Sequence, residues 1–317
     1  MKSIGIDIGG TNIVCGLVSD EGQILCKTAC KTHAERPADE ITRDIARLID
    51  RALEETGMSR ESVPFCGVGC PGIANVDKGV LEYASNLPSF LNYPLTARLK
   101  QFSGIGRVVL ENDANCAAKG EAEVGAARGV SSSVFITLGT GVGGGFISEG
   151  KVFHGFNFAG AELGHIVIDP NGPVCSCGRR GCWETFSSAT ALVRQTRAAM
   201  EKDQKSVMWE LVSGDINEVD GRTAFDALRR GDKTASAVVA DFCRFLACGI
   251  TNIVNIFQPE VLSVGGGISA EGETLLAPVR EILRREEYSR GCEKRTVLKK
   301  AELGNDAGVI GAAFLWK

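Results

Sequence analysis

The chain has 317 residues, of which 44% are hydrophobic and 23% charged, and its formal net charge at pH 7 is −4. Such a chain can bury a real core and is long enough for two domains of about 150 residues each. The slightly acidic balance argues against nucleic acid as a partner, and the absence of an apolar run of about 18 residues argues against a membrane. No secretory signal sequence opens the chain, and all but three of its twelve cysteines are scattered, so we expect reduced thiols and a cytoplasmic location.

The first predicted elements are strands, and they occur twice. Residues 4–25 contain an apolar strand, a Gly/Thr turn, a second apolar strand, an acidic-Gly turn and a third strand, and residues 134–153 repeat this order. Asp7-Ile-Gly-Gly-Thr11 thus corresponds to Thr137-Leu-Gly-Thr-Gly141. A duplication of this length predicts two halves that share one fold.

Helical and strand patterns alternate over the rest of the chain, as in an α/β fold. Apolar residues recur at helical spacing from Ile41 to Leu53, before Gly57, and again from Ala237 to Phe257. Further strands and one last helix are predicted at Phe65–Gly72, Val108–Leu110, Val261–Val264 and Asp306–Trp316. We therefore expect two α/β domains, residues 1–113 with the helix at 306–317 packed back onto them, and residues 114–305.

The Gly-rich turns offer bare backbone N–H groups that suit the phosphates of a nucleotide. Glycine lets the main chain approach an anion closely, and threonine adds a hydroxyl donor. Asp7, at the end of the first strand, is placed to orient a Mg²⁺ on those phosphates. Taken singly, each turn can equally be an ordinary hairpin. The candidate nucleotide-binding residues are Asp7, Gly9, Gly10, Thr11, Asn12, Gly139, Thr140, Gly141 and, in a third turn, Gly265, Gly266 and Gly267.

An acid follows the predicted strand at Val108–Leu110, in Asn112-Asp113. In α/β sheets, ligands bind beyond the carboxyl ends of the strands. Transfer of a phosphoryl group to an alcohol needs a base within reach of the hydroxyl proton, and one aspartate suffices. The alternative is that Asp113 only caps a helix that begins near Ala114. Beside two phosphate-type turns, we favour the base.

One His and three Cys lie close enough in the sequence to hold one metal ion. They are His165, Cys175, Cys177 and Cys182, a set that suits a closed tetrahedral zinc site of structural type. The alternative is that these cysteines are small core residues. Glu162 and Glu184 flank the segment, so a zinc that fixes the loop would also fix two carboxylates, which can bind the hydroxyls of a polar ligand.

These segments together resemble the ROK family (repressors, open reading frames and kinases) of the actin-like ATPase superfamily. The resemblance covers essentially the whole chain. It rests on Asp7-Ile-Gly-Gly-Thr11, Cys70-Pro-Gly72, Ser85-Asn-Leu-Pro88, Asn112-Asp-Ala-Asn115, Leu138-Gly-Thr-Gly-Val-Gly-Gly-Gly145, Glu162-Leu-Gly-His165, Cys175-x-Cys-Gly-x-x-Gly-Cys-x-Glu184 and Gly265-Gly-Gly267. It implies an α/β fold of two actin-like (ribonuclease H-like) domains with a duplicated ββ-turn phosphate motif and a zinc-braced loop.

The resemblance also implies roles for individual residues. Asp113 is the expected catalytic base and Asn112 a sugar contact. Glu162, His165 and Glu184 are expected to bind sugar hydroxyls, with His165 also a ligand of the structural Zn²⁺. The cleft is expected to be lined by Gly72, Ser85 and Asn86. Ala161 departs from the family, which usually has glycine before this glutamate, and its methyl group is expected to narrow the sugar pocket.

The implied function is transfer of the γ-phosphoryl group of Mg-ATP to the 6-hydroxyl of a hexose. Glucose is the first expected substrate, because the Cys-x-Cys-Gly-x-x-Gly-Cys-x-Glu form resembles the glucokinase branch. The alternatives are N-acetylmannosamine, allose or another hexose, polyphosphate as the donor, or a non-catalytic sugar-sensing regulator. Repressors of the family carry a further N-terminal helix-turn-helix domain, whereas this sequence begins on the first strand. The resemblance also leads us to expect a homodimer.

Overall fold

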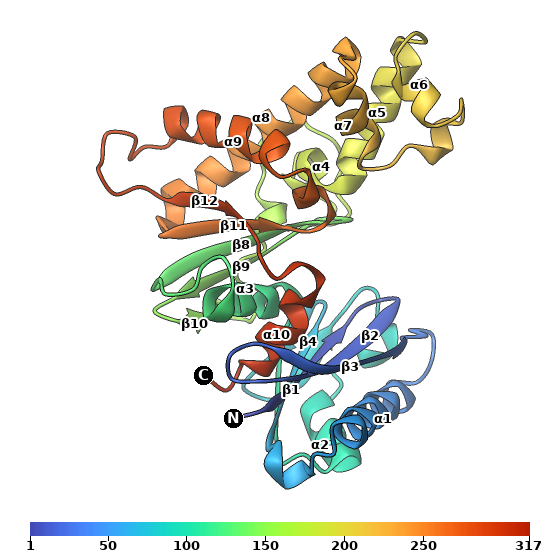
Figure 1. Cartoon of the computed structure of the whole chain (residues 1–317), viewed down its shortest axis with the longest axis vertical. Helices are drawn as coiled ribbons and strands as arrows, with labels where there is room; N and C mark the ends of the chain where they lie inside the picture. Colours follow the sequence, from blue (N-terminus) through green and yellow to red (C-terminus); the bar gives the residue numbers. More distant parts are fainter. The chain divides into compact units, whose positions relative to one another are not determined.

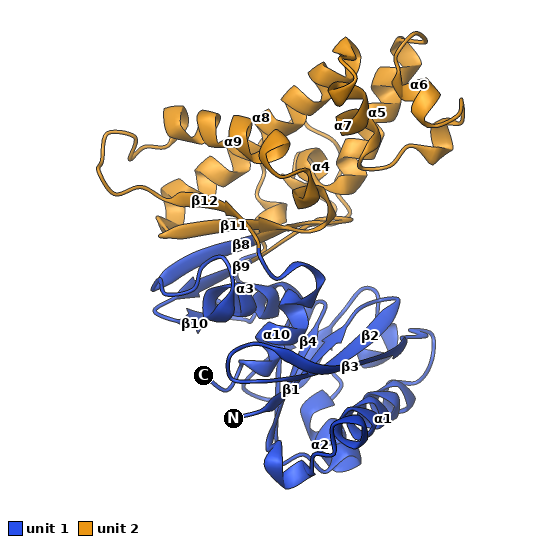
Figure 2. Ribbon diagram, viewed as in Figure 1, with its two compact units in different colours: residues 1–135, 145–161, 302–317 blue, residues 136–144, 162–301 orange.

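The computed structural model describes all 317 residues, and the chain divides into two compact units (Figure 2). Unit 1 comprises Met1–Phe135, Gly145–Ala161 and Glu302–Lys317, and unit 2 comprises Ile136–Gly144 and Glu162–Ala301. Unit 1 includes helix α3 (Asp113–Val124), which the expected division at residue 113 assigned mostly to the second domain. The helix lies in unit 1 because it packs against the C-terminal helix α10 (Ala307–Ala313).

Two five-stranded sheets share one strand order, so the duplication predicted from the sequence is confirmed and extends beyond the opening strands (Figure 1). The first sheet has the order β3 (Ile24–Lys31), β2 (Asn12–Val18), β1 (Ser3–Ile8), β4 (Phe65–Cys70), β7 (Arg107–Asn112). The second has the order β10 (Lys151–Val152), β9 (Val142–Ser148), β8 (Ser132–Leu138), β11 (Val261–Gly265), β12 (Val297–Lys300). The strands β5 (Ile73–Asn75) and β6 (Val80–Tyr83) form a small antiparallel sheet.

Parallel pairing in the first sheet aligns the carboxyl ends of three strands. Strand β4 pairs in parallel with β1 and with β7, so that Asp7 lies opposite Gly69 and Cys70 lies opposite Asn112. The antiparallel hairpin of β1 and β2 turns at this same edge. The first Gly-rich turn and the Asn112-Asp113 corner therefore lie at one edge of one sheet, where α/β folds bind their ligands.

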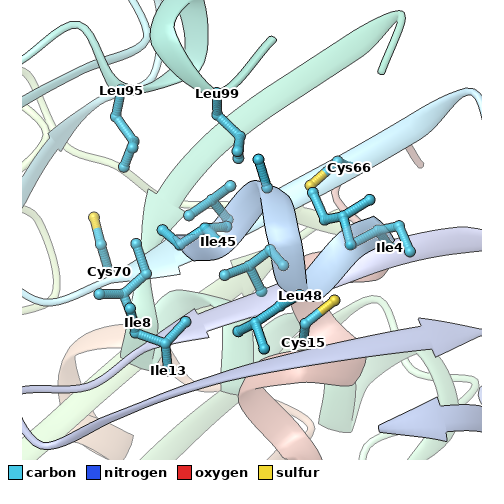
Figure 3. Close-up of a cluster of buried hydrophobic side chains, with 14 of the residues drawn as sticks. Ile4, Ile8, Ile13, Cys15, Ile45, Leu48, Cys66, Cys70, Leu95 and Leu99 are labelled. Carbon is cyan, nitrogen blue, oxygen red and sulfur yellow. The ribbon is translucent and has the colours of Figure 1, made fainter. Parts of the chain in front are cut away.

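Helices α1 (Ala38–Thr56) and α2 (Leu95–Ser103) cover one face of the first sheet. The apolar side chains of α1 point into the sheet, and the helix ends where Gly57 adopts a left-handed conformation, so the predicted helix and its stop are confirmed. Figure 3 shows part of this core, in which Ile45 and Leu48 of α1 cluster with Ile4 and Ile13 of the sheet.

Helix α10 packs on the opposite face of this sheet, with α3 beside it. Its approach is close because glycines line the contact: a Cβ atom at Gly5 or Gly67 would overlap backbone atoms of α10, and one at Gly311 would overlap the carbonyl oxygen of Cys116 in α3. The predicted last helix is thus present, although its α-helical part is shorter than Asp306–Trp316.

The helices of unit 2 pack around one long apolar helix, α8 (Lys233–Phe257). Its length and composition would suffice to cross a membrane, but 61% of its most apolar stretch is buried inside the protein. It contacts α4, α5, α7 and α9 and is therefore the core helix of this unit. The other helices are α4 (Glu184–Ser187), α5 (Ala189–Lys202), α6 (Met208–Leu211), α7 (Thr223–Arg229) and α9 (Glu273–Glu286).

The close contact at Gly311 predicts that alanine at this position destabilises the protein, although alanine favours helices more than glycine does. Alanine is intrinsically better than glycine in a helix by about 1 kcal/mol, yet Gly311→Ala forces α10 away from α3. We expect the free energy of unfolding to fall by about 1–3 kcal/mol, measured by urea denaturation. Gly291→Ala is the control, because a Cβ there has no neighbour within 4 Å, and it should leave stability unchanged. Equal stabilities for both variants would contradict the close packing of α10.

Candidate functional site

The corner between β7 and α3 holds the predicted base. Asn112, and not Asp113, is the N-cap of α3, since its side-chain oxygen accepts the N–H groups of Ala114 and Asn115 at 2.9 and 3.2 Å. The side-chain amide of Asn112 donates to the carbonyl of Gly72 at 3.1 Å. Asp113 is the first residue of the helix and is half-buried. Its carboxylate accepts the N–H of Ala114 at 2.8 Å.

Asp7 and Asp113 form a pair of neighbouring carboxylates at the edge of the first sheet. Burial, and then the charge of Asp113, raise the pKa of Asp7 to about 6. The side chain of Asp7 also faces the start of α10, where a Cβ at Gly308 would lie 2.9 Å from its Oδ2 atom. Two acids in a desolvated site favour a bound cation, so the donor set fits a hard divalent ion such as Mg²⁺.

The first Gly-rich turn is exposed, and hydrogen bonds to its backbone hold it in place. The N–H of Gly9 donates to the carbonyl of Asn12 at 2.9 Å, and the hydroxyl of Thr32 donates to the carbonyl of Gly9 at 2.7 Å. Gly10 and Thr11 are exposed. The turn therefore exposes its backbone at the surface, and the side chain of Asn86 lies beside it at Gly10.

The predicted sugar-cleft residues of unit 1 surround this turn and the Asn112 corner. The side-chain amide nitrogen of Asn86 would lie 3.1 Å from a Cβ at Gly10, so Asn86 lies beside the turn. Gly72, which accepts the hydrogen bond from Asn112, has a φ of +88°, and a Cβ there would overlap the carbonyl of Tyr83. Ser85 is exposed next to Asn86.

The predicted metal ligands come together in unit 2. The ligand atoms of His165, Cys175, Cys177 and Cys182 all lie within 4.8 Å of one another. The Cys177 and Cys182 sulfurs are 3.6 Å apart, as are the Cys175 sulfur and the Nδ1 atom of His165. Tetrahedral zinc with Zn–S near 2.3 Å and Zn–N near 2.1 Å separates its ligands by about 3.6–3.8 Å. The residues therefore fit a zinc ion, with Nδ1 as the histidine ligand.

Short hydrogen-bonded turns bring these distant ligands together. The N–H of Cys175 donates to the carbonyl of Arg179 at 2.8 Å, and isolated bridges join Val167 to Cys182 and Val174 to Arg180. Gly181 has a φ of +70°, and a Cβ there would overlap the carbonyl oxygen of Asp169. Only glycine suits that position, which explains its place one residue before the last ligand.

Trp183 anchors the loop to the core of unit 2. Its side chain is fully buried, and its indole N–H donates to the carbonyl of Phe245 in α8 at 3.0 Å. The ring packs directly on Gly249 of α8, where a Cβ atom would overlap it. The residues on either side of Trp183, Cys182 and Glu184, are therefore held by the longest helix of the unit.

Glu184 joins the metal cluster to the second Gly-rich turn. Its Oε1 atom lies 3.0 Å from the Cys175 sulfur and 3.7 Å from Nδ1 of His165. Its Oε2 atom accepts the N–H of Val142 at 3.4 Å and would lie 2.6 Å from a Cβ at Gly141. Glu184 has therefore one oxygen at the cluster and the other at the turn.

Glu162 is, with His165 and Glu184, the third residue of unit 2 that is predicted to bind a sugar. The Glu162 carbonyl accepts the N–H of His165 at 3.1 Å. Partial desolvation raises the pKa of Glu162, His165 opposes the rise, and the charge of Glu184 adds to it. Because both neighbours act on its carboxylate, the structure brings together the three residues of unit 2 predicted to bind a sugar.

A pocket of about 360 Å³ lies beside the second turn. Thr140, Gly141, Glu184, Ser188 and Arg194 are among its lining residues. The turn itself closes with a bond from the N–H of Gly139 to the carbonyl of Gly141 at 3.0 Å. Hydroxyls, backbone N–H groups and a guanidinium thus face one hollow, a set that suits a phosphorylated ligand.

In the third turn, Gly265–Gly267, the fold itself explains some of the glycines. Gly265 is buried as the last residue of β11, and Gly266 has a φ of +81°. A Cβ at Gly266 would overlap backbone atoms of Leu138 in β8. Gly267 is exposed, and a Cβ there has no neighbour within 4 Å. Gly266 and Gly267 are both exposed, and packing explains glycine at Gly266 but not at Gly267.

Sequence reasoning missed a buried acid and its partner. Glu111, 3% exposed, precedes Asn112, and its Oε2 atom lies 2.6 Å from Nε2 of His154. A charged residue at the end of an apolar strand was a visible signal for Glu111. No spacing rule links it to His154, 43 residues later.

Known proteins are similar to this chain over nearly its whole length. The ROK family profile matches residues 3–317. The chain is 39% identical to a glucokinase of Thermotoga maritima over 318 residues, covering 100% of this chain and 98% of that protein. It is 30% identical to an N-acetylmannosamine kinase of Citrobacter koseri, covering 99% and 98% of the two chains.

A solved structure is similar over the same length. The crystal structure of a ROK family glucokinase from Streptomyces griseus, in complex with glucose and AMPPNP, has a TM-score of 0.82 and 35% identity. The match covers 99% of each chain. The similarity therefore extends over both units of the chain.

Proposed function

This chain belongs to the ROK family, and from that premise we propose that it is an ATP-dependent kinase for the 6-hydroxyl of a hexose, with glucose as the first substrate. The observation that carries the proposal is the Asp7–Asp113 pair beside an exposed Gly-rich turn. It is supported by the full-length similarity to a glucokinase that binds glucose and an ATP analogue. A sugar kinase needs a base, a cation site and a phosphate cradle, and these residues supply all three.

The proposed roles in unit 1 follow from the contacts at the sheet edge. Asp113 accepts the proton of the sugar hydroxyl, and Asp7 orients Mg²⁺ on the phosphates. Asn112, fixed by its bond to Gly72, contacts the sugar with the remaining hydrogen of its amide. Ser85 and Asn86 line the same cleft. The two duplicated turns bind ATP phosphates, and the third turn, Gly265–Gly267, packs against the adenine or ribose.

The proposed roles in unit 2 centre on the zinc loop. Glu162, His165 and Glu184 bind sugar hydroxyls, with Nε2 of His165 free for this contact when Nδ1 binds zinc. The zinc is structural: four protein ligands leave no open position for a substrate. It fixes the loop, and the loop fixes the two carboxylates. We also propose, from the family, a cytoplasmic homodimer.

Ala161 bears on the space available to the sugar. It has a φ of +62°, a conformation that costs a residue with a Cβ about 1 kcal/mol or more, and it directly precedes Glu162. Its methyl group narrows the space beside a proposed sugar-binding carboxylate. The second candidate substrate, N-acetylmannosamine, rests instead on the name of one relative.

A kinase assay over a panel of hexoses and N-acetylhexosamines tests the function, and Asp113→Asn tests the base. The substitution keeps the shape but removes the proton acceptor, so we expect kcat on glucose to fall roughly 10²–10⁴-fold. ADP release is the readout, and exposed Asp20→Asn is the control. A kcat near the wild-type value in Asp113→Asn would mean that Asp113 is only the first residue of α3 and not the base.

Gly139→Val tests the nucleotide assignment without disturbing the protein. A side chain at Gly141 would collide with Glu184 and one at Gly10 would approach Asn86, whereas Gly139 has no neighbour within 4 Å. We expect ATP affinity to fall at least about tenfold, because a branched side chain prevents close approach of phosphates, while glucose affinity stays. Calorimetry with both ligands is the measurement. Unchanged ATP affinity would mean that the turn is an ordinary hairpin.

Cys177→Ser tests the zinc loop. We expect one tightly bound zinc per wild-type chain and loss of zinc in the variant. Displacement of Glu162 and Glu184 by about 1 Å then lowers turnover on the order of 100-fold, while ATP affinity largely survives. Elemental analysis and kinetics are the readouts, and Cys292→Ser, an exposed cysteine outside the cluster, is the control. Zinc-free wild-type protein would refute the assignment.

A further inference from the structure

A buried acid, Glu111, and a partly exposed histidine, His154, form an ionisable pair next to the Asn112-Asp113 corner. Glu111 is the second-last residue of β7 and has only 4% of its side chain exposed, whereas the His154 side chain is 32% exposed; Nε2 of His154 lies 2.6 Å from Oε2 of Glu111. Neither residue belongs to the metal cluster or to the Gly-rich turns. An isolated carboxylate at this depth would carry a large desolvation cost, so the partner that neutralises it has a structural or functional purpose.

Glu111 organises the corner that carries Asp113. Its Oε1 atom accepts the N–H of Asn112 at 2.8 Å and the side-chain amide of Asn115 at 3.0 Å. Asn112 in turn caps α3 and binds Gly72. A shift of this one carboxylate would therefore move the residues on both sides of Asp113.

His154 fixes the other end of the pair to the segment that follows β10. The carbonyl of His154 accepts the N–H of Gly160 at 2.8 Å, which closes residues 154–160 into a tight loop. The ring of Phe158 packs edge-on against the imidazole, with 6.4 Å between ring centroids. Phe158 and Ala161 both have φ values of +62°, so this loop holds strained backbone just before Glu162 in the sequence.

We propose that Glu111 and His154 are positioning residues for phosphoryl transfer, an ion pair with a buried carboxylate that holds the Asn112-Asp113 corner and the loop before Glu162 in their working geometry. This inference rests on the proposed kinase function. Neither residue touches the reacting atoms. Their effect is to fix where the proposed base points, and misplacement by about 1 Å can cost on the order of 100-fold in rate.

The charges around His154 give the pair a defined pH dependence. The hydrogen bond that the His154 imidazolium donates to Glu111 raises the pKa of His154, burial opposes the rise, and the charges of Glu111 on β7 and Asp77 on the β5–β6 turn add to it. The imidazolium is therefore present at low pH and is lost as pH rises through this raised pKa. The support for the corner, and the contribution of the pair to stability, weaken in the same window above about pH 6.5.

The experiment measures the rate of phosphoryl transfer to glucose in single turnovers from about pH 6 to about pH 9.5. The wild-type rate should fall on the alkaline side. In His154→Leu the rate should be about 10–100-fold lower at pH values where the wild type is fastest, with ATP affinity unchanged. His154→Gln keeps one neutral donor to Glu111, so it should recover part of the rate but lose the alkaline fall, which a purely structural role would not predict.

Imidazole NMR follows the pair without any turnover. The chain has three histidines, so each can be assigned by substitution. His154 should titrate above the ordinary histidine pKa in the wild-type chain and lower in Glu111→Gln. The control is His33→Asn, because His33 is exposed and asparagine tolerates its φ of +48°. An ordinary pKa for His154, or a wild-type rate in His154→Leu, would overturn the inference, whereas a wild-type chain without turnover on any hexose would contradict the proposed function instead.

Discussion

The packing of α10 against the first sheet and α3 is the contact on which the rest of unit 1 depends. Backbone meets backbone there, because the positions that face α10 in the sheet include Gly5 and Gly67. The buried carboxylate of Glu121 in α3 accepts the N–H groups of Glu302 and Leu303, just before α10. With α3 fixed at both its ends, the side chain of its first residue, Asp113, has a defined place beside Asp7. The geometry of the proposed base is thus a consequence of glycine packing and of one buried acid.

In unit 2 the equivalent constraint is the cysteine–histidine cluster. A polar loop rich in turns has too little apolar surface to hold a fixed shape by itself. The Trp183 anchor and the clustered ligand atoms of the one histidine and three cysteines, which fit a zinc ion, take the place of a hydrophobic core. Glu184 links this cluster to the second Gly-rich turn, because one of its oxygens lies at the cluster and the other at the N–H of Val142. A metal bound there would set the position of a turn that contributes none of its ligands.

The features that were predictable from the sequence are those with short-range signals. Period-two strands with Gly turns revealed the duplication, the stop at Gly57 revealed the end of α1, and close Cys spacing indicated the cluster of one histidine and three cysteines. The alternative role that we weighed for Asp113, as the cap of α3, was wrong, because Asn112 is the cap. Asn and Asp are both good caps, and only tertiary contacts decide between them. The place of α3 in unit 1 and the Glu111–His154 pair depend on contacts between segments far apart in the chain, for which one sequence carries no local pattern.

The glycines of the turns show how a structural requirement and a ligand requirement can be separated. Where a Cβ would overlap backbone, as at Gly181 and Gly266, the fold alone explains the residue. At Gly139 and Gly267 a Cβ would have no neighbour within 4 Å, and neither has a positive φ. Packing and backbone conformation therefore leave glycine unexplained at half-buried Gly139 and exposed Gly267. A bare backbone there costs conformational entropy and gains no packing, and an anion bound to the main chain is the partner that such turns suit.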